Sequence, residues 1–249
     1  MARVAIISDI HGNGVALDAV LADIARDEVD NVICLGDLAA GGPQPDAVIS
    51  RLRELDCQVV RGNADCWLLA SLPPGGSTET RRLEEVVAWA RTRLAADDWE
   101  YLAALPTTLH LSTDGLDLFC FHGSPSADTD SLLATTPAAK VDQLLAGAPA
   151  ASVLAGGHTH LQMLRRHRAA LLVNPGSVGL PLDALSTGAA PLPAWAEYAT
   201  VAVGAGDLEI VYRRVPVDVD ALAAATAWMP HRSWARDLAT RIARWNARA

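Results

Sequence analysis

The sequence has little positive charge, with 20 lysines and arginines against 29 aspartates and glutamates and a net charge of −9. A protein that binds long nucleic acids usually has a basic surface, because neutralising phosphates supplies much of the affinity. We therefore expect no long DNA or RNA partner. A small phosphorylated substrate is compatible with the charge, because bound metal ions can outweigh distant carboxylates.

Long apolar runs are also missing. No stretch is long and apolar enough to span a bilayer, so we expect no membrane partner. The apolar run near the start, Val4–Ile7, is too short for a secretory signal, and no small-residue cleavage site follows it. Only four cysteines occur, and Cys34 and Cys120 lie in apolar, strand-like runs. We expect unpaired, reduced cysteines and a cytoplasmic location.

The first third of the chain alternates between strand and helix patterns. Apolar residues make up 51% of the 249 residues, enough for the core of one α/β domain. Apolar positions at helical spacing predict a helix between the first two strands, and a short helix to about residue 55 precedes the third. A parallel sheet with crossover helices is expected from this order. The predicted strands are residues 3–8, 32–35 and 58–61.

The rest of the chain predicts an α/β fold with a mixed sheet arrangement and no strong domain boundary, hence one domain over 1–249. A helical block at about 73–106 is expected to form a cap or a flanking layer, and the tail at 218–249 is expected to be mostly helical. Further strands are predicted at 108–112, 116–121, 153–155, 171–173, 198–203 and 208–214.

The C-terminal tail carries apolar residues on one predicted helix face and arginines largely elsewhere. Such a helix is interpreted as a terminal helix docked on the core, with a homo-oligomer contact through its tryptophans as one form of that docking. Binding to a membrane or a partner is the alternative. The apolar face comprises Trp234, Leu238, Ile242 and Trp245.

Metal-binding side chains follow five predicted strands, each beside a glycine. Ligands collect beyond the carboxyl ends of strands in α/β sheets, so these side chains are expected to converge. Glycine allows the positive φ and close backbone approach that this convergence needs. The donors are Asp9, His11, Asp37, Asn63, His122, His158 and His160.

Seven donors suit two metal ions. A carboxylate can bridge two cations, so Asp37 could serve both and leave three donors for each. The expected separation is about 3.5–4 Å, as used for in-line attack at phosphorus. Mixed imidazole and carboxylate ligation favours Mn, Fe, Zn, Co or Ni over Ca or Mg.

Each piece of this pattern also has an ordinary structural explanation. Asp-x-His is common, Gly-Asp usually forms a turn or a helix N-cap, and Gly-Asn usually forms a turn. A lone His122 is more often a strand-end histidine. His158 and His160 are less common, because alternate residues share a face on an extended segment. The prediction depends on all the pieces occurring together.

The same residues resemble a known family. The series Asp9-x-His11, Gly36-Asp37, Gly62-Asn63-x-Asp65, His122-Gly123 and Gly157-His158-x-His160 is similar to the signature of calcineurin-like metallophosphoesterases. Asn174–Gly179 is typical of their small bacterial and archaeal phosphodiesterase branch. The resemblance implies a four-layer fold of two facing sheets flanked by helices.

The resemblance also implies a ligand set and a mechanism. One metal would be held by Asp9, His11, Asp37 and His160, and a second by Asp37, Asn63, His122 and His158. A hydroxide bridging the two ions would be the nucleophile. Asp37, Asn63 and His158 are our candidates for catalysis.

One position departs from the family pattern. Many members have a histidine after the asparagine, which assists the leaving group or orients the phosphate, but here the residue is Ala64. Losing a general acid costs about 10²–10⁴-fold. We therefore expect slow turnover with poor leaving groups and better activity on aryl phosphodiesters.

Three further features have two explanations each. Asn13 either binds a phosphate oxygen, as Asn63 is also expected to do, or starts the next helix. Asp65 either orients a ligand histidine or caps a helix. The Asn174–Gly179 turn is expected to be structural and to bring backbone amides close to the site.

The most favoured function is that of a phosphodiesterase acting on a small phosphorylated substrate. Hydrolysis of phosphomonoesters, phosphoproteins or dinucleotide polyphosphates stays open. A non-catalytic scaffold with the same fold is the alternative from another class, although a scaffold is expected to lose its ligands. Substrate specificity is expected to depend on the helical block and on the loops at 73–80 and 180–194.

Overall fold

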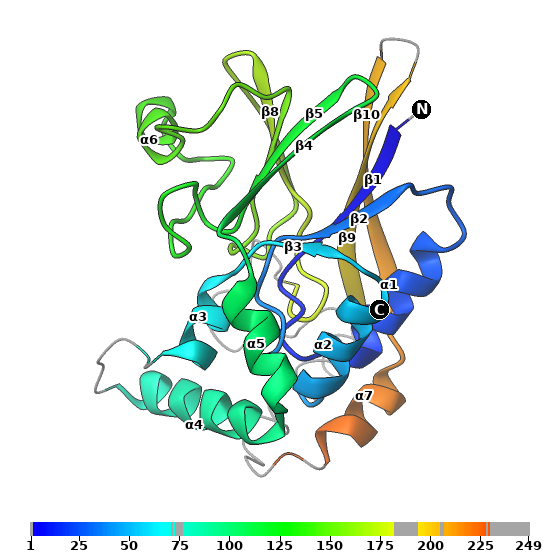
Figure 1. The fold of residues 1–249 in the computed structure, drawn as a ribbon, viewed down its shortest axis with the longest axis vertical. Coiled ribbons are helices and arrows are strands. Elements are labelled where there is room, and N and C mark those ends of the chain that lie inside the picture. The colour runs from blue at the N-terminus through cyan, green and yellow to red at the C-terminus, as the bar shows by residue number, and fades with distance from the viewer. Residues whose placement is uncertain are drawn as a thin grey trace.

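The computed structural model describes residues 2–70, 72, 77–181, 194–204, 207–227 and 229. Residues 73–76 of the predicted loop at 73–80, most of the loop at 180–194, and the tail beyond residue 229 lie outside these residues. Figure 1 shows two β-sheets with helices packed around them. In the described part of the chain, no helix is both long and apolar enough to cross a membrane.

The first sheet has the strand order β10-β9-β1-β2-β3. Strands β1, β2 and β3 are parallel, β9 runs antiparallel to β1, and β10 antiparallel to β9. The third strand is shorter than predicted, because Arg61 N bonds to Pro106 O and leaves the ladder. The bounds are β1 Ala2–Ile7, β2 Asn31–Cys34, β3 Gln58–Val59, β9 Trp195–Gly204 and β10 Asp207–Pro216.

The helices of the first half cover one face of this sheet. Helix α1 begins after Asn13, whose side chain accepts a hydrogen bond from Ala16 N, and α2 begins with Pro45 at its first position. The helical block at 73–106 contains α4 and α5, whereas α3 was implied only by the alternative in which Asp65 caps a helix. The bounds are α1 Gly14–Ile24, α2 Pro45–Glu54, α3 Asn63–Leu69, α4 Thr78–Arg93 and α5 Ala96–Ala104.

The second sheet has the strand order β4-β5-β6-β8-β7. Its hairpin β4–β5 and the parallel strands β5, β6 and β8 match the predicted ranges closely. Strand β7 and helix α6 were not predicted. The bounds are β4 Thr108–Thr113, β5 Leu116–Phe121, α6 Ala138–Leu144, β6 Val153–Ala155, β7 Met163–His167, β8 Ala170–Asn174 and α7 Val219–Thr226.

Side chains alternate between the two faces of a strand, so neighbouring residues of one strand enter different hydrophobic cores. On β1, Val4 and Ile6 face the core between the sheets, whereas Ala5 and Ile7 face the core under the helices. On β5, Phe119 belongs instead to a core that includes Val141 and Leu144 of α6. The expected four layers, helices on two facing mixed sheets, are confirmed.

Candidate metal centre

The seven predicted donors come together between the two sheets. Four of them follow strands of the first sheet, and three follow strands of the second. Because the parallel strands of each sheet end at the same edge, side chains distant in sequence converge there. The first sheet supplies Asp9, His11, Asp37 and Asn63, and the second supplies His122, His158 and His160.

One half of the centre contains Asp9, His11 and His160. The Nε2 atom of His160 lies 3.2 Å from Asp9 Oδ1, and the Nε2 atom of His11 lies 3.9 Å from the same oxygen. The two Nε2 atoms are 3.1 Å apart. One donor atom from each residue lies within 4.8 Å of the others, which suits a single ion.

The other half contains Asp37, His122, Asn63 and His158. The Nε2 atom of His122 lies 3.4 Å from Asp37 Oδ2 and 3.0 Å from Asn63 Oδ1. That amide oxygen is also 2.7 Å from His158 Nδ1. Asp9, Asp37 and His122 form a second group of donors within 4.8 Å of one another.

Two carboxylates lie between these halves, rather than one. Asp37 Oδ2 is 3.6 Å from His11 Nε2 and 3.4 Å from His122 Nε2, in the position expected of a bridging ligand. Asp9 Oδ1 lies 4.0 Å from His122 Nε2 as well as near the first pair of imidazoles. The bridging role of Asp37 stays a prediction, and Asp9 is equally central.

The protein sets the orientation of three imidazoles. The Nδ1 atoms of His11, His122 and His160 lie 2.8, 2.7 and 2.7 Å from backbone carbonyl oxygens. A carbonyl can only accept, so each Nδ1 carries the hydrogen. When a ring is neutral, as a metal ligand must be, its Nε2 lone pair is directed into the centre. This is the arrangement that metal-ligating histidines adopt.

Each carboxylate has one oxygen held by the protein and one directed at the imidazoles. Asp9 Oδ2 accepts from Ser8 Oγ at 2.6 Å and from His158 N at 3.1 Å, and Asp37 Oδ1 accepts from Ala64 N at 2.7 Å. Among the described residues, the buried Asp9 Oδ1 has no hydrogen-bond donor. A buried carboxylate oxygen without a donor is costly, and a cation satisfies it. The donor set therefore fits divalent metal ions.

The carboxylates and imidazoles of the centre shift one another's pKa values. Burial alone would raise the pKa of Asp9 and Asp37, but the neighbouring imidazoles hold both pKa values below their usual range. Burial would lower the pKa of His122, but Asp37 raises it to about 10. Burial lowers the pKa of His11. Two ionised carboxylates in a buried site make it a place for positive charge.

The ligand loops have unusual backbone conformations. The φ angles of Asp9, His11, Asp37, His158 and His160 are 55°, 51°, 58°, 68° and 57°, all in the left-handed region. Such strain gathers at functional sites. The expectation that the last two donors share a face of an extended segment was wrong, because the chain turns at both and directs the rings to opposite halves of the centre.

Glycines let the loops approach one another. Gly36 has a φ of +99°, as expected, but Gly62 and Gly157 are needed for space. A Cβ atom on Gly62 would lie 2.2 Å from Asp37 Oδ1, and one on Gly157 would lie 2.2 Å from Ser8 Oγ. The close approach of the ligand loops therefore depends on glycine at these positions.

Asp65 joins two of the loops. Its buried carboxylate accepts hydrogen bonds from the amides of Gly62, Asp37 and Leu38, each at 2.9 Å. The capping explanation is confirmed, since Gly62 is the N-cap of α3. The orienting of a ligand histidine is not what the structure shows. Burial, followed by repulsion from Asp37, raises the pKa of Asp65 to about 7.

Asn13 and the Asn174–Gly179 turn have internal partners. The Asn13 side chain accepts from Ala16 N and donates to Gly179 O, both at 3.1 Å, so its role at the start of α1 is confirmed. Its contact with substrate stays a prediction. The Val178 and Gly179 amides bond to the carbonyls of Ser8 and Asp9, so the turn fixes the first ligand loop.

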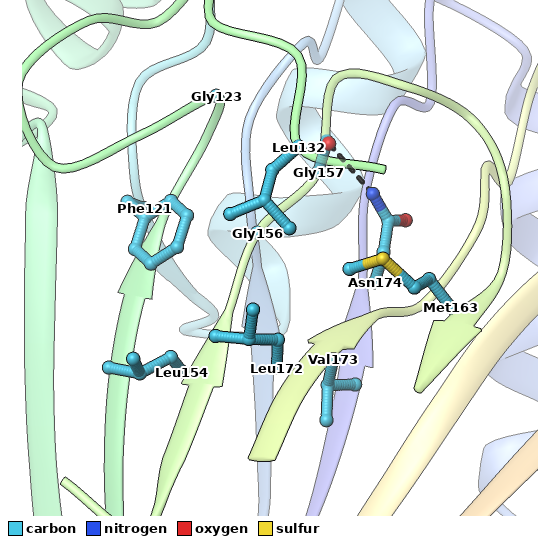
Figure 2. Close-up of a pocket in the computed structure, with 10 residues that line it drawn as sticks. All are labelled: Phe121, Gly123, Leu132, Leu154, Gly156, Gly157, Met163, Leu172, Val173 and Asn174. Carbon is cyan, nitrogen blue, oxygen red and sulfur yellow. Dashed lines mark hydrogen bonds between the residues drawn. The ribbon is translucent and has the colours of Figure 1, made fainter. Parts of the chain in front are cut away.

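A small cavity lies behind the last ligand loop (Figure 2). Its volume is about 10 Å³, close to the minimum for one water molecule. Asn174 lines it and donates a hydrogen bond from Nδ2 to Gly157 O at 2.8 Å. Phe121 lines the opposite wall, where a Cβ on Gly156 would lie 2.6 Å from its ring. The residues that pack behind this loop are therefore mostly apolar.

Sequence reasoning missed Ser8 and the amide partners of Asp65. Ser8 is fully buried, and its hydroxyl bonds to Asp9. Its position immediately before a ligand was the available signal, but a serine at a strand end has many other uses. Asp65 was recognised as a candidate, but its partners across two loops depend on the packing of β2 against α3.

The chain is similar to known proteins over most of its length. The protein is 26% identical over 198 residues to an uncharacterised protein of Methanocaldococcus jannaschii, covering 74% of this chain and 79% of that one. The crystal structure of a metallophosphoesterase from Sphaerobacter thermophilus is similar, with 26% identity, a TM-score of 0.72, and coverage of 97% and 99% of the two chains.

A hypothetical protein from Pyrococcus horikoshii shares the fold, with 22% identity, a TM-score of 0.77, and coverage of 96% of this chain and 98% of that one. Residues 2–192 match the model of the calcineurin-like phosphoesterase superfamily domain. Together with the convergent Asp and His donors, this match shows that the chain belongs to the calcineurin-like phosphoesterase superfamily.

Proposed function

We propose that the protein is a phosphodiesterase that hydrolyses a small phosphorylated substrate with two divalent transition-metal ions, which are Mn, Fe, Zn, Co or Ni. The observation that carries the proposal is Asp9 Oδ1, a buried oxygen that has no hydrogen-bond donor in the described part of the chain and lies near three imidazole Nε2 atoms. When bound, the ions supply an activated water nucleophile and neutralise the phosphoryl oxygens.

Different residues of the centre have different roles in the proposed reaction. Asp9 and Asp37 provide the negative charge that holds the ions, and three histidines are oriented by backbone carbonyls. Asn63 and His158 lie together at the other end of the centre, where His158 is only partly buried. We assign both residues to the second ion and Asn63 also to a contact with the substrate phosphate. A scaffold would be expected to lose such donors, but all seven are present.

Because residue 64 is alanine, we expect a preference for diesters with good leaving groups. This residue stands where a leaving-group histidine occurs in many relatives, and its side chain is 1% exposed. No imidazole from this position can protonate the departing oxygen. Aryl phosphodiesters, whose leaving oxygen is already acidic, are therefore the substrates with which we expect measurable turnover.

The test measures metal content and hydrolysis in the same preparation. The protein is loaded with Mn²⁺, and bis(4-nitrophenyl) phosphate is compared with 4-nitrophenyl phosphate and a dinucleotide polyphosphate. We expect the diester to be cleaved fastest, with Asp37→Asn and His158→Ala each lowering kcat/KM at least about 100-fold. If both variants keep full activity, the proposed mechanism is wrong. Faster cleavage of the monoester or polyphosphate would favour those substrate classes instead.

A further inference from the structure

A second polar cluster lies at the same sheet edge as the metal centre. Strand β9 runs antiparallel to β1, with Ala199 opposite Ile6. Trp195 and Glu197 therefore continue past the end of β1, where the 174–179 turn connects Glu197 to the loop that carries the first metal donors. Arg214 on β10 pairs with Glu197 across the hairpin. Trp195, Glu197 and Arg214 are called the rim cluster below.

The rim cluster holds one guanidinium in a fixed orientation. Glu197 is buried, and its Oε1 atom accepts hydrogen bonds from Trp195 Nε1 at 3.1 Å and from Arg214 Nε at 3.0 Å. The guanidinium carbon of Arg214 lies 4.8 Å from the centroid of the Trp195 ring. The ion pair and the aromatic face together restrict the rotation of the arginine.

The outer end of that guanidinium is available. The Arg214 side chain is 59% exposed, and within the described residues its two Nη atoms have no hydrogen-bond partner. A planar guanidinium that is held through Nε and presents both Nη groups to solvent matches the geometry of a carboxylate or a phosphate. Its orientation is set before binding, which lowers the entropic cost of capturing an anion.

The rim cluster is connected to the first half of the metal centre. Glu197 N donates to Ser177 O at 2.9 Å, and the Ser177 hydroxyl donates to the carbonyl of Asp9 at 2.7 Å. The same hydroxyl accepts from Leu180 N, and the carbonyl of Leu180 is the partner of His160 Nδ1. Gly176 lies against Glu197, where a Cβ atom would be 2.3 Å from Oε2.

We propose that Arg214, supported by Trp195 and Glu197, is a subsite for a negatively charged group of the substrate other than the phosphate that is cleaved. This inference rests on the proposed phosphodiesterase function and narrows its substrate class. The preferred diester carries a carboxylate or a further phosphate on one ester group. That group lies on the side of the centre formed by Asp9 and His160.

The test uses a matched set of 4-nitrophenyl alkyl phosphodiesters. Their alkyl chains have equal length and end in a carboxylate, a phosphate, a hydroxyl or a trimethylammonium group. For the Mn²⁺-loaded protein, we expect kcat/KM for the better anionic ester to exceed that for the hydroxyl ester about tenfold, the size of one charge-assisted hydrogen bond. The cationic ester is expected to be the slowest, and the two anionic esters show which group the subsite prefers.

Two arginine variants separate a subsite from a general effect of charge. Arg214→Gln is expected to bring the ratio of anionic to hydroxyl ester close to one. Arg213→Gln removes the same charge from the neighbouring residue, which pairs with Asp27, and is expected to leave the ratio as in the wild type.

Three outcomes would contradict the subsite. Equal cleavage of the charged and neutral esters by the wild type overturns it but leaves the phosphodiesterase function intact. A preference that survives in Arg214→Gln, or that is lost equally in Arg213→Gln, assigns the effect to some other part of the protein. A failure to cleave even the hydroxyl ester contradicts the phosphodiesterase function itself, and the subsite with it.

Discussion

His11 and His160 face each other with their Nε2 atoms 3.1 Å apart, while the Nδ1 atom of each lies against a backbone carbonyl. With both rings neutral, the facing atoms are two lone pairs that repel each other unless a proton or a metal ion lies between or beside them. Asp9 Oδ1 is close to both atoms. These three donors are therefore arranged for a cation before any substrate arrives.

Removing one of these imidazoles should remove one ion. His160→Ala deletes a donor from the first half of the centre only, so we expect metal content to fall from about two ions per chain to about one. The measurement is mass spectrometry of metals after Mn²⁺ loading and desalting. His167→Ala, which deletes a histidine bonded to Asp142 at the surface, is the control and should keep both ions. Equal metal content in the two variants would contradict the assignment.

The stability of metal-free protein should depend on pH through His122. Its pKa in the folded protein is about 10, raised above 6.5 by Asp37 against the effect of burial. A raised histidine pKa means that the charged form stabilises the fold. This contribution is complete below a pH of about 6.5 and is lost as the pH rises towards 10.

Urea unfolding of the metal-stripped protein between pH 6 and pH 10 measures this effect. The free energy of unfolding should fall over that range in the wild type, and the fall should be smaller in His122→Gln. Saturating Mn²⁺ should reduce the dependence in the wild type, because the metal takes the place of the proton on Nε2. An identical pH profile in both metal-free proteins would refute the role of His122.

Asp65→Asn should weaken metal binding as well as stability. The substitution puts an amide group against three backbone N–H donors, so at least one of them loses its acceptor. We expect a loss of about 2–3 kcal/mol in the free energy of unfolding and a roughly 10–100-fold loss in metal affinity. Urea unfolding measures the change in stability, and a metal competition assay measures the change in affinity.

A matched control for this variant is Asp98→Asn. Asp98 occupies the same position of α5 that Asp65 occupies in α3, and its carboxylate accepts from Ala95 N at 2.9 Å. That substitution should cost about 1 kcal/mol and leave metal affinity unchanged. If both variants bind metal equally well, Asp65 acts only as a helix cap.

Gly179→Ala should disrupt the turn that holds Asp9. A Cβ atom there would lie 1.8 Å from the carbonyl oxygen of Ile10, which is backbone and cannot move aside cheaply. We expect a loss of about 3 kcal/mol or more in the free energy of unfolding. Gly14→Ala is the control, because its nearest neighbour is the flexible Gln44 side chain. A thermal melt that shifts equally in both variants would show that the contact is relieved easily.

Much of the centre was predictable because strand ends are local signals. The sequence around Asp9 or His122 shows an apolar run that stops at a polar ligand beside a glycine, and parallel packing then brings the ends together. The left-handed φ angles of the ligands were not predictable from residue type, since aspartate and histidine adopt them only when the surrounding structure imposes the strain.

Some elements and contacts could not be predicted, because they bury few apolar residues or because their partner residues are distant in the sequence. Helix α6 buries only Val141 and Leu144, and the exposed positions of β7 include Arg166, so neither shows a strong apolar pattern. The rim cluster depends on the register of β9 against both β1 and β10. Arg214 lies 17 positions from Glu197, and no local pattern connects them.

Both β-sheets contribute donors to each half of the centre. An ion bound there would cross-link the two sheets at one end, in the way that a disulfide links two segments. Removing the ions with a chelator would then do more than stop turnover. It would remove a cross-link and let the two sheets separate more readily at that edge. Resistance to proteolysis of the loops after β1, β2 and β6 would rise and fall with metal occupancy.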